Sequence, residues 1–408
     1  MRRTVLLLAL GILSSAVAAG CGSSSGSSGG SGGDQSSTSS AKLPDGPITI
    51  GMAIARSGFA APYDLGPARG AELAVADINA RGGVLGHQLK LQYGDTKSDR
   101  ALGTTVALDL LSQGAKAMVV TCDFDLGSPA AITATGKNVV AVSPCAGASS
   151  FDVPTLGPLA YSMGTKAGAG ATNVAHFAYD KGYRKAFLWL DSSITQTKET
   201  CSAFNSVFGA LPGAKVVGSD TIQQKDTSFA GQIAKLRKSG ADVLELCSYN
   251  PGAATALRQL RAAGVDIPVT SHLAMDGSYW LKGVPNLKDF YYDAFGSLYG
   301  DDPRADVNKF FARYKAKFGE PAVTSYALTG YATIQELAKA IATAKTTNGA
   351  ALAKAVDGLG SYETIAGPSG YSAKQHIVSD RPAVIMSVHG GQVSPAATYA
   401  GGRKTEVR

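Results

Sequence analysis

The cysteines and histidines of this 408-residue chain are the side chains best suited to redox, metal or nucleophilic chemistry, and their spacing limits what they can do. No C-x-x-C pair occurs, and the five histidines are dispersed, so we expect neither a metal site nor a redox motif. A G-x-S-x-G match at 22–26 lies in a Ser/Gly-rich run, where the strand and helix of a nucleophile elbow cannot form. We therefore expect no cofactor, no metal and no catalysis, with weak hydrolysis as a remote alternative. The histidines are His87, His176, His272, His376 and His389.

The N-terminus has the pattern of an export signal followed by a tether. Arg2 and Arg3 precede an apolar run at 4–13, and small residues lead to Cys21. The stretch Ala18 to Cys21 resembles a bacterial lipobox, although Ala18 replaces the usual Leu, and an ordinary signal cleaved nearby is the alternative. We expect residues 1–20 to be a signal peptide. Cys21 would then carry a lipid on the outer face of the cytoplasmic membrane, with a flexible tether over 21–43 rich in Ser and Gly.

The four remaining cysteines form an even set, which in an exported protein suggests disulfides. Cys122 and Cys145 each end an apolar run, Cys201 lies in a helical pattern, and Cys247 ends a later run. We predict the pairs 122–145 and 201–247, each worth roughly 3–4 kcal/mol through the entropy of the unfolded chain. Four free buried thiols are the alternative.

Composition excludes several classes of protein. Hydrophobic residues make up 45% and charged residues 17%, so the chain is not disordered as a whole. The single long apolar run is at the N-terminus, which excludes several membrane spans. The net charge of +7 comes from scattered Lys and Arg, so no nucleic-acid partner is expected.

The elements that must position a site alternate between strands and helices. Apolar runs without polar alternation are typical of parallel strands buried on both faces. They occur at 48–54, 89–93, 117–120, 139–142, 186–190 and 243–246. Helical patterns lie at 66–80, 99–113, 166–181, 196–209, 228–239, 252–263, 303–318 and 325–345. This is a doubly wound α/β pattern. It is interrupted at 144–165 and then restarts, which indicates two similar lobes with a ligand cleft at the carboxyl ends of the strands.

Specific motifs resemble the branched-chain amino-acid-binding proteins, the type I periplasmic substrate-binding proteins of ABC importers. They are Ser57-Gly58, Tyr63, the stretch 70–83 with Gly86, Asp95, Ser98-Asp99, Gly114, Ser143-Pro144, Asp191, Phe229, 257–264, 314–319 and Pro321. The resemblance implies two Rossmann-like lobes joined by three crossover segments. Lobe 1 would comprise 44–164 and 297–368, and lobe 2 would comprise 165–296 and 369–408. It also implies a small-molecule ligand and an ABC importer permease as partners. We expect the protein to act as a monomer.

In lobe 1 the resemblance assigns ligand contacts to two loops, and the second departs from the family pattern. The first loop offers Ser57, Gly58 and Tyr63. Beside them, the guanidinium of Arg56 could bind a ligand carboxylate through two hydrogen bonds, or it could be a solvated cation. In the second, Phe124 takes the position of a carboxylate-binding Ser, between Asp123 and Asp125. Phe124 could stack on a ligand with Tyr63 and Tyr249, or it could pack within the lobe.

The remaining implied contacts also differ from the family. Where the family has an Ala-Ala-Thr stretch, this chain has Cys145, Ala146 and Gly147, so a Thr hydroxyl is lost. A Tyr that is frequent in the family is replaced here by Ile194 or Thr195. Tyr249 and Asn250 keep an aromatic-plus-Pro loop. His272 falls where the family places an acid for the ligand ammonium, and Asp276 could substitute for it, although a lone His is more often structural.

Both ends of an amino-acid clamp are therefore altered, and an unpaired buried charge is costly. We expect an amino acid or, in preference, a related amide, aromatic or other small polar ligand. The predicted function is that of a solute-binding lipoprotein of an ABC importer. A binding subunit that senses ligand for a membrane signalling partner is the alternative.

Overall fold

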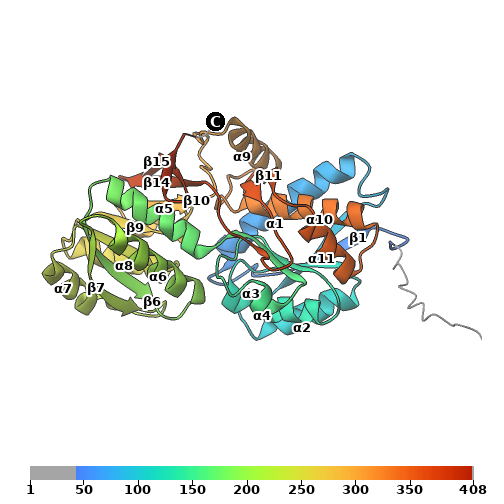
Figure 1. Ribbon diagram of the computed structural model, residues 1–408, viewed down its shortest axis with the longest axis horizontal. Coiled ribbons are helices and arrows are strands. Elements are labelled where there is room, and N and C mark those ends of the chain that lie inside the picture. Colours follow the sequence, from blue (N-terminus) through green and yellow to red (C-terminus); the bar gives the residue numbers. More distant parts are fainter. Residues whose placement is uncertain (1–42, 407–408) are drawn as a thin grey trace, which may run out of the picture. The chain divides into compact units, whose positions relative to one another are not determined.

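The computed structural model describes residues 43–406, which contain two large β-sheets flanked by helices (Figure 1). The predicted signal peptide, Cys21 and nearly all of the tether lie outside the described residues. The first sheet has the order β13-β5-β4-β3-β1-β2, and all of its strand pairs are parallel. Its strands are β1 (Ile48–Ile54), β2 (Leu89–Asp95), β3 (Ala117–Val120), β4 (Ala141–Ser143), β5 (Ala160–Thr165) and β13 (Ile377–Val378).

Helices from both ends of the chain cover this first sheet. From the first half come α1 (Ala61–Ala80), α2 (Leu102–Ser112), α3 (Phe124–Thr135) and α4 (Val153–Leu156), and from the second half α9 (Ala305–Phe318), α10 (Ala327–Ala344) and α11 (Gly349–Asp357). Helix α10 lies against α1 (Figure 1). Two glycines allow this approach, because a Cβ on Gly70 would come 2.0 Å from the Ala327 carbonyl oxygen and one on Gly330 would come 2.1 Å from that of Pro67.

The second sheet has eight strands in the order β16-β15-β14-β10-β9-β8-β6-β7. The five from β7 to β10 pair in parallel, and the last three add an antiparallel edge. The strands are β6 (Lys185–Asp191), β7 (Lys215–Ile222), β8 (Val243–Cys247), β9 (Val269–Ser271), β10 (Phe290–Ala294), β14 (Ala383–His389), β15 (Gln392–Ala400) and β16 (Arg403–Thr405). Its helices are α5 (Ala167–Asp180), α6 (Thr195–Ala210), α7 (Ala230–Ser239) and α8 (Gly252–Ala262), with short turns η1 (Leu273–Met275) and η2 (Leu281–Gly283).

The chain passes between the two sheets three times, after β5, after β10 and after β13. The third passage corrects an expected boundary. Residues from 369 onward were expected in lobe 2, but β13 pairs with β5 and so extends the first sheet. A two-residue strand has too few positions to produce a pattern in the sequence. A small hairpin of β11 (Tyr362–Thr364) and β12 (Gly367–Ser369) precedes it.

Arg381, in the third passage, is buried and bonds to strands β5 and β12 from inside the protein. Its side chain is 2% exposed, and Nη1 donates to the Met163 carbonyl oxygen at 3.0 Å while Nε donates to that of Pro368 at 3.0 Å. The guanidinium also lies 5.5 Å from the ring centroid of Phe295, at the second passage. A buried cation that serves carbonyl groups of separate segments holds them in a fixed arrangement.

The predicted fold class is confirmed, and most predicted elements lie within a few residues of their positions. The strands at 48–54 and 117–120 have the predicted bounds. Helix α3 begins at Phe124, where a loop was expected, because Asp123 accepts a hydrogen bond from the Leu126 amide and caps the helix. Within residues 43–406, no helix combines the length and apolar character needed to cross a membrane.

Candidate ligand-binding site

Three tyrosines from different parts of the chain form an aromatic cluster at the carboxyl ends of the two sheets. Tyr63 comes from α1, Tyr249 follows β8, and Tyr326 precedes α10. The ring centroids of Tyr63 and Tyr249 are 5.4 Å apart, and those of Tyr63 and Tyr326 are 6.2 Å apart. Tyr63 and Tyr249 were predicted together from their loop positions. Tyr326 was missed, because it follows a Pro-containing loop and not a predicted strand.

Hydrogen bonds fix two of these hydroxyls, and both bonds join the lobes. The Asn250 amide donates to the Tyr63 hydroxyl oxygen at 3.0 Å, and the Tyr326 hydroxyl donates to the Leu273 carbonyl oxygen at 2.9 Å. A cavity of about 10 Å³ remains among the three rings. This volume holds about one water molecule. A small organic ligand would therefore require the rings, and the lobes that carry them, to separate.

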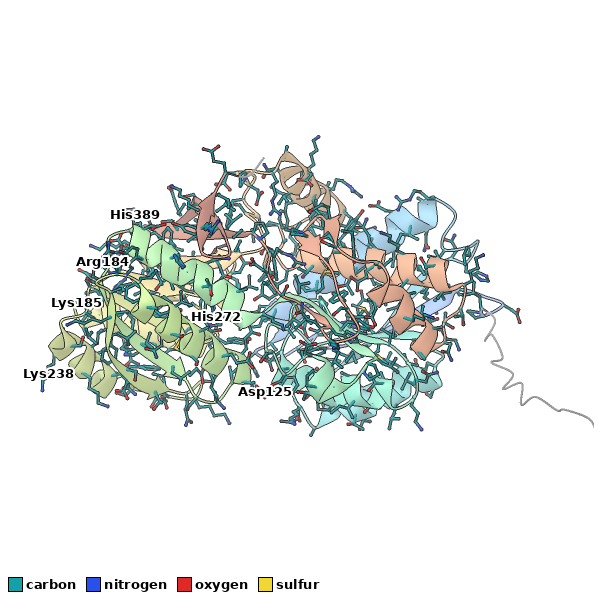
Figure 2. All side chains as sticks on the ribbon, in the orientation of Figure 1. Asp125, Arg184, Lys185, Lys238, His272 and His389 are labelled. Carbon is teal, nitrogen blue, oxygen red and sulfur yellow. A yellow bond between two sulfur atoms is a disulfide. The ribbon has the colours of Figure 1, made fainter. Side chains whose placement is uncertain are left out.

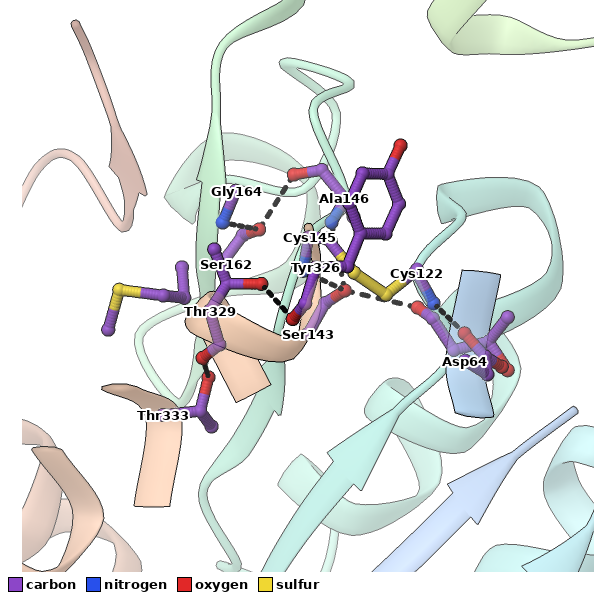
Figure 3. Close-up of a disulfide and its surroundings, with 12 residues drawn as sticks. Asp64, Cys122, Ser143, Cys145, Ala146, Ser162, Gly164, Tyr326, Thr329 and Thr333 are labelled. Atoms are coloured by element: carbon purple, nitrogen blue, oxygen red, sulfur yellow. Dashed lines mark hydrogen bonds between the residues drawn. A yellow bond between two sulfur atoms is a disulfide. The ribbon is translucent and has the colours of Figure 1, made fainter. Parts of the chain in front are cut away.

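The first wall of the cluster is built from strand-end loops that one acid and one disulfide join. Asp64 is buried, and its carboxylate accepts from the Ala55 amide at 2.7 Å and the Cys122 amide at 2.8 Å. These bonds connect the loops after β1 and β3. Burial raises the pKa of Asp64 to about 7, against the effect of the amide donors. Cys122 is bonded to Cys145, which connects the loops after β3 and β4 (Figure 3).

Both predicted disulfides are present. The second joins Cys201 of α6 to Cys247 at the end of β8 and fixes the helix on its sheet.

The loop after β4 is bonded both to strand β5 of its own lobe and to helix α6 of lobe 2. The Gly147 amide donates to Gln196 Oε1 at 3.0 Å, and the Ala146 carbonyl oxygen accepts from the Ser162 hydroxyl at 2.6 Å. A Cβ on Gly147 would come within 2.8 Å of the Thr165 carbonyl oxygen, so the Thr typical of the family does not fit this backbone. Gln196 was missed, because it directly follows the predicted Thr195 inside a helical pattern and carries no distinct signal.

Asp125 crosses to the other lobe at the start of α6. Its carboxylate accepts from the Thr195 amide at 2.8 Å and the Thr195 hydroxyl at 2.8 Å. Figure 2 labels Asp125 on the first lobe where it meets the second. Ile194 offers no side-chain cap to α6, so the acid from the other lobe takes this role. Burial raises the pKa of Asp123 to about 7, and the neighbouring charge of Asp125 adds to the rise.

The structure does not bring Phe124 to the tyrosine cluster. Its ring packs edge-on against Phe151, with centroids 6.4 Å apart, among apolar residues of the first lobe. The alternative prediction, that Phe124 packs within the lobe, describes this position.

The first residues of the loop after β1 are held away from the cluster. Ser57 donates its hydroxyl to Asp95 at 2.8 Å, and the Arg56 guanidinium lies 5.0 Å from the ring centroid of Tyr93. Gly58 has a φ of +83°, and a Cβ there would come 2.5 Å from Ser98 Oγ. Arg56, Ser57 and Gly58 are exposed and thus form the rim of the site and not its interior.

His272 and Asp276, the two candidates for the missing acid, lie in different surroundings. His272 is 3% exposed, and its ring centroid is 5.7 Å from that of Tyr249. Burial lowers the pKa of His272 to about 4, so the ring is neutral. The carboxylate of Asp276 accepts a hydrogen bond from the Ser325 amide at 2.5 Å. One of its oxygens therefore binds the segment before α10. In the described part of the chain, no group of three or more His, Cys, Asp or Glu side chains could hold a metal ion.

Comparison with known proteins agrees with this geometry. The family model described as "Periplasmic binding protein" matches residues 47–392. A Leu/Ile/Val-binding protein homolog 1 of Brucella abortus is 25% identical over 340 residues, covering 80% of this chain and 86% of that protein. An amino acid binding protein of Pseudomonas aeruginosa is 28% identical over 360 residues, covering 82% of this chain and 88% of that protein.

Solved structures share the fold at lower identity. The branched-chain amino-acid transporter substrate-binding protein LivJ of Streptococcus pneumoniae, in complex with isoleucine, has a TM-score of 0.78 and 22% identity, and the match covers 88% of this chain and all of that one. An ABC-transporter solute-binding protein of R. palustris, in complex with benzoate, has a TM-score of 0.72 and 18% identity, and the match covers 88% and 98% of the two chains. The family consists of solute-binding proteins and not enzymes. Its model matches most of the sequence, so this chain belongs to the periplasmic binding protein family.

Proposed function

We propose that this protein is the solute-binding component of an ABC importer. It would capture a small organic molecule between its two lobes outside the cytoplasm and deliver it to a permease. The observation that carries this proposal is the cluster of Tyr63, Tyr249 and Tyr326, which lies between the strand ends of the two sheets. Contacts across the lobes surround it, so binding and lobe closure are coupled.

The ligand is proposed to be an organic molecule with an apolar or aromatic body. Tyrosine rings supply a large apolar surface and stack on aromatic groups. Related folds have been solved with isoleucine, benzoate and 4-hydroxybenzoate, so both aliphatic amino acids and aromatic acids are reasonable probes. The loop after β4 has Gly147 where the family has a hydroxyl, and Phe124 packs away from the cluster, which favours a ligand recognised differently from leucine.

We propose that a lipid on Cys21 attaches the protein to the membrane. The protein would act as a monomer close to the membrane surface. The motif before Cys21 and the Ser/Gly-rich stretch after it support this. Labelling with palmitate in the producing cells is expected for the full chain. A Cys21→Ser variant should lose the label and leave the membrane fraction, and a variant that keeps both would exclude the anchor.

A thermal-shift screen of the purified full chain tests the binding function. The panel contains amino acids, amides, aromatic acids, amines, sugars and polyamines. A ligand that binds the native state raises the melting temperature by mass action. At least one compound is expected to do so, and the shift should be lost in Tyr249→Ala but kept in Tyr299→Ala, since Tyr299 is exposed and outside the cavity. No shift with any compound would count against a transport role.

A further inference from the structure

An open pocket of about 380 Å³ lies within lobe 2, between helix α6 and strands β6 and β7. Figure 1 shows α6 beside these two strands. The pocket shares no lining residue with the cavity among the tyrosines. Pockets that hold small molecules commonly measure about 300–1,000 Å³, so this one has room for a small ligand of its own.

Polar side chains from two elements form the rim of this pocket. Lys198, Ser202 and Asn205 of α6 are spaced by four and three residues, so they share one face of the helix over about 10 Å. Ser219 and Thr221 of β7 are spaced by two, so they share one face of the strand. All five residues are exposed, and an entering molecule meets them first.

The deeper lining of the pocket is apolar, and a disulfide holds its walls together. Leu188 and Cys201 are buried, while Leu190 and Val216 are half-buried. The bond between Cys201 and Cys247 fixes α6 on the sheet. The pocket therefore combines an apolar base with a polar rim, which is the usual composition of a small-molecule site.

Most of the polar rim is free to bind a ligand. Within residues 43–406, the side chains of Lys198, Ser202, Asn205 and Ser219 have no hydrogen-bond or ion-pair partner.

The one acid of the lining is already engaged. Asp220 lies 2.8 Å from Lys235 Nζ through Oδ2, and its Oδ1 accepts from the Thr221 amide at 3.0 Å. Lys198 is thus the unpaired charge of the pocket, and it favours an acidic group over an amine.

The free groups also indicate what the rest of the ligand carries. A serine hydroxyl and an asparagine amide each donate and accept hydrogen bonds, and so do the hydroxyl groups of a ligand. A lysine ammonium only donates, so it suits a carboxylate or a phosphate. No aromatic residue is among those that line the pocket, so it lacks the stacking surface of the tyrosine cluster.

We propose that this pocket is a second binding site, which takes a small hydroxylated acid of the size of an acidic sugar or a sugar phosphate. Lys198 binds the acidic group, and Ser202, Asn205 and Ser219 bind hydroxyl groups. The carbon skeleton lies over the apolar base. The site is separate from the tyrosine cluster, so it adds a ligand to the one captured between the lobes.

Calorimetric titration of the full chain with three sugars tests the site. Glucose 6-phosphate and glucuronate carry an acidic group, and glucose is the neutral control. At least one of the acids is expected to bind saturably, about tenfold or more tightly than glucose, because only the acids pair with Lys198. The acid that binds more tightly shows whether the pocket prefers a phosphate or a carboxylate.

Matched variants locate the binding. Lys198→Met removes the charge and keeps the apolar stem, so it should weaken binding of the acids about tenfold. Lys238→Met changes an exposed lysine of the same lobe outside the pocket and should leave binding unchanged. Both positions are exposed, so the melting temperature of the ligand-free protein should stay the same. Tyr249→Ala should also leave binding unchanged, because Tyr249 lines the other cavity.

The inference is overturned if neither acid binds, if glucose binds as tightly, or if Lys198→Met binds the acids as tightly as the unmodified protein. Binding of an acid that is lost in Tyr249→Ala would also overturn it. That result would support the proposed function, since the ligand would then lie among the tyrosines.

Discussion

Single buried acids decide how the strand-end loops are arranged. Asp64 is the clearest case, since one carboxylate holds the amides of Ala55 and Cys122 from two different loops. Without it, both amides are left in an apolar environment with no acceptor.

Asp64→Ala is expected to lower the free energy of unfolding by about 2–4 kcal/mol, the usual cost of leaving buried polar groups unsatisfied. Denaturant unfolding of the full chain measures this. Asp109→Ala changes an exposed acid on α2 and should have little effect. Equal stability of the two variants would contradict the role given to Asp64.

Glu245 predicts a dependence of stability on pH. It is fully buried, accepts from the Thr270 hydroxyl at 2.6 Å, and burial raises its pKa to about 8. An unfolded Glu loses its proton near pH 4.3, so between about pH 5 and 8 the folded state holds a proton that the unfolded state has lost. The contribution of Glu245 to the free energy of unfolding therefore falls by about 1.4 kcal/mol per pH unit as the pH rises through this range.

Glu245→Gln removes that titration. The stability of this variant relative to the unmodified protein should increase as the pH rises from 5 to 8, as measured by urea unfolding at several pH values. Glu363→Gln, at an exposed position, serves as the control. A stability difference that stays constant across this range would show that Glu245 does not titrate as described.

At the scale of elements, residues that follow predicted strands could be identified from sequence, and others could not. Tyr63, Tyr249 and His272 could be found because a parallel sheet brings strand ends together. Tyr326 and Gln196 could not, because contacts between the lobes, and not local patterns, bring them to the site. Phe124 was misjudged for a local reason, since the cap at Asp123 starts a helix where a loop was expected.

The strand and helix order was largely predictable for a similar reason. Buried parallel strands have apolar runs that stand out, as at β1 and β3. The boundary expected at residue 369 was wrong, because the chain returns to lobe 2 only after β13. The position of that passage depends on the pairing of β13 with β5, which is a long-range contact.

Helix α6 is capped by an acid of the other lobe, and this gives a prediction about lobe contact. Asp125→Ala removes both bonds to Thr195. Amides in the first turn of α6 should then exchange hydrogen about tenfold faster, corresponding to a cap worth roughly 1–2 kcal/mol. Hydrogen exchange with mass spectrometry measures this, and peptides from α7 serve as an internal control. Unchanged exchange in α6 would mean that the lobes do not depend on this contact.

At the scale of the whole molecule, the two lobes meet through a small set of polar contacts around the aromatic cluster. The contacts between Tyr63 and Asn250, Asp125 and Thr195, and Gly147 and Gln196 all join lobe 1 to lobe 2. Because these bonds are few, they can be broken and remade. The fold is therefore compatible with opening and closing of the two lobes. A ligand shifts this equilibrium only as far as it binds the closed state better.

Binding at the tyrosine cluster is the central claim, and isothermal titration calorimetry of the full chain tests it most directly. L-isoleucine, benzylamine and benzoate are titrated into the unmodified protein, Tyr249→Ala and Tyr299→Ala. We predict saturable binding of at least one compound, weakened about 30-fold, equivalent to roughly 2 kcal/mol, by Tyr249→Ala and unchanged by Tyr299→Ala. Binding that is equally tight in all three proteins, or no binding of any compound, would contradict the account.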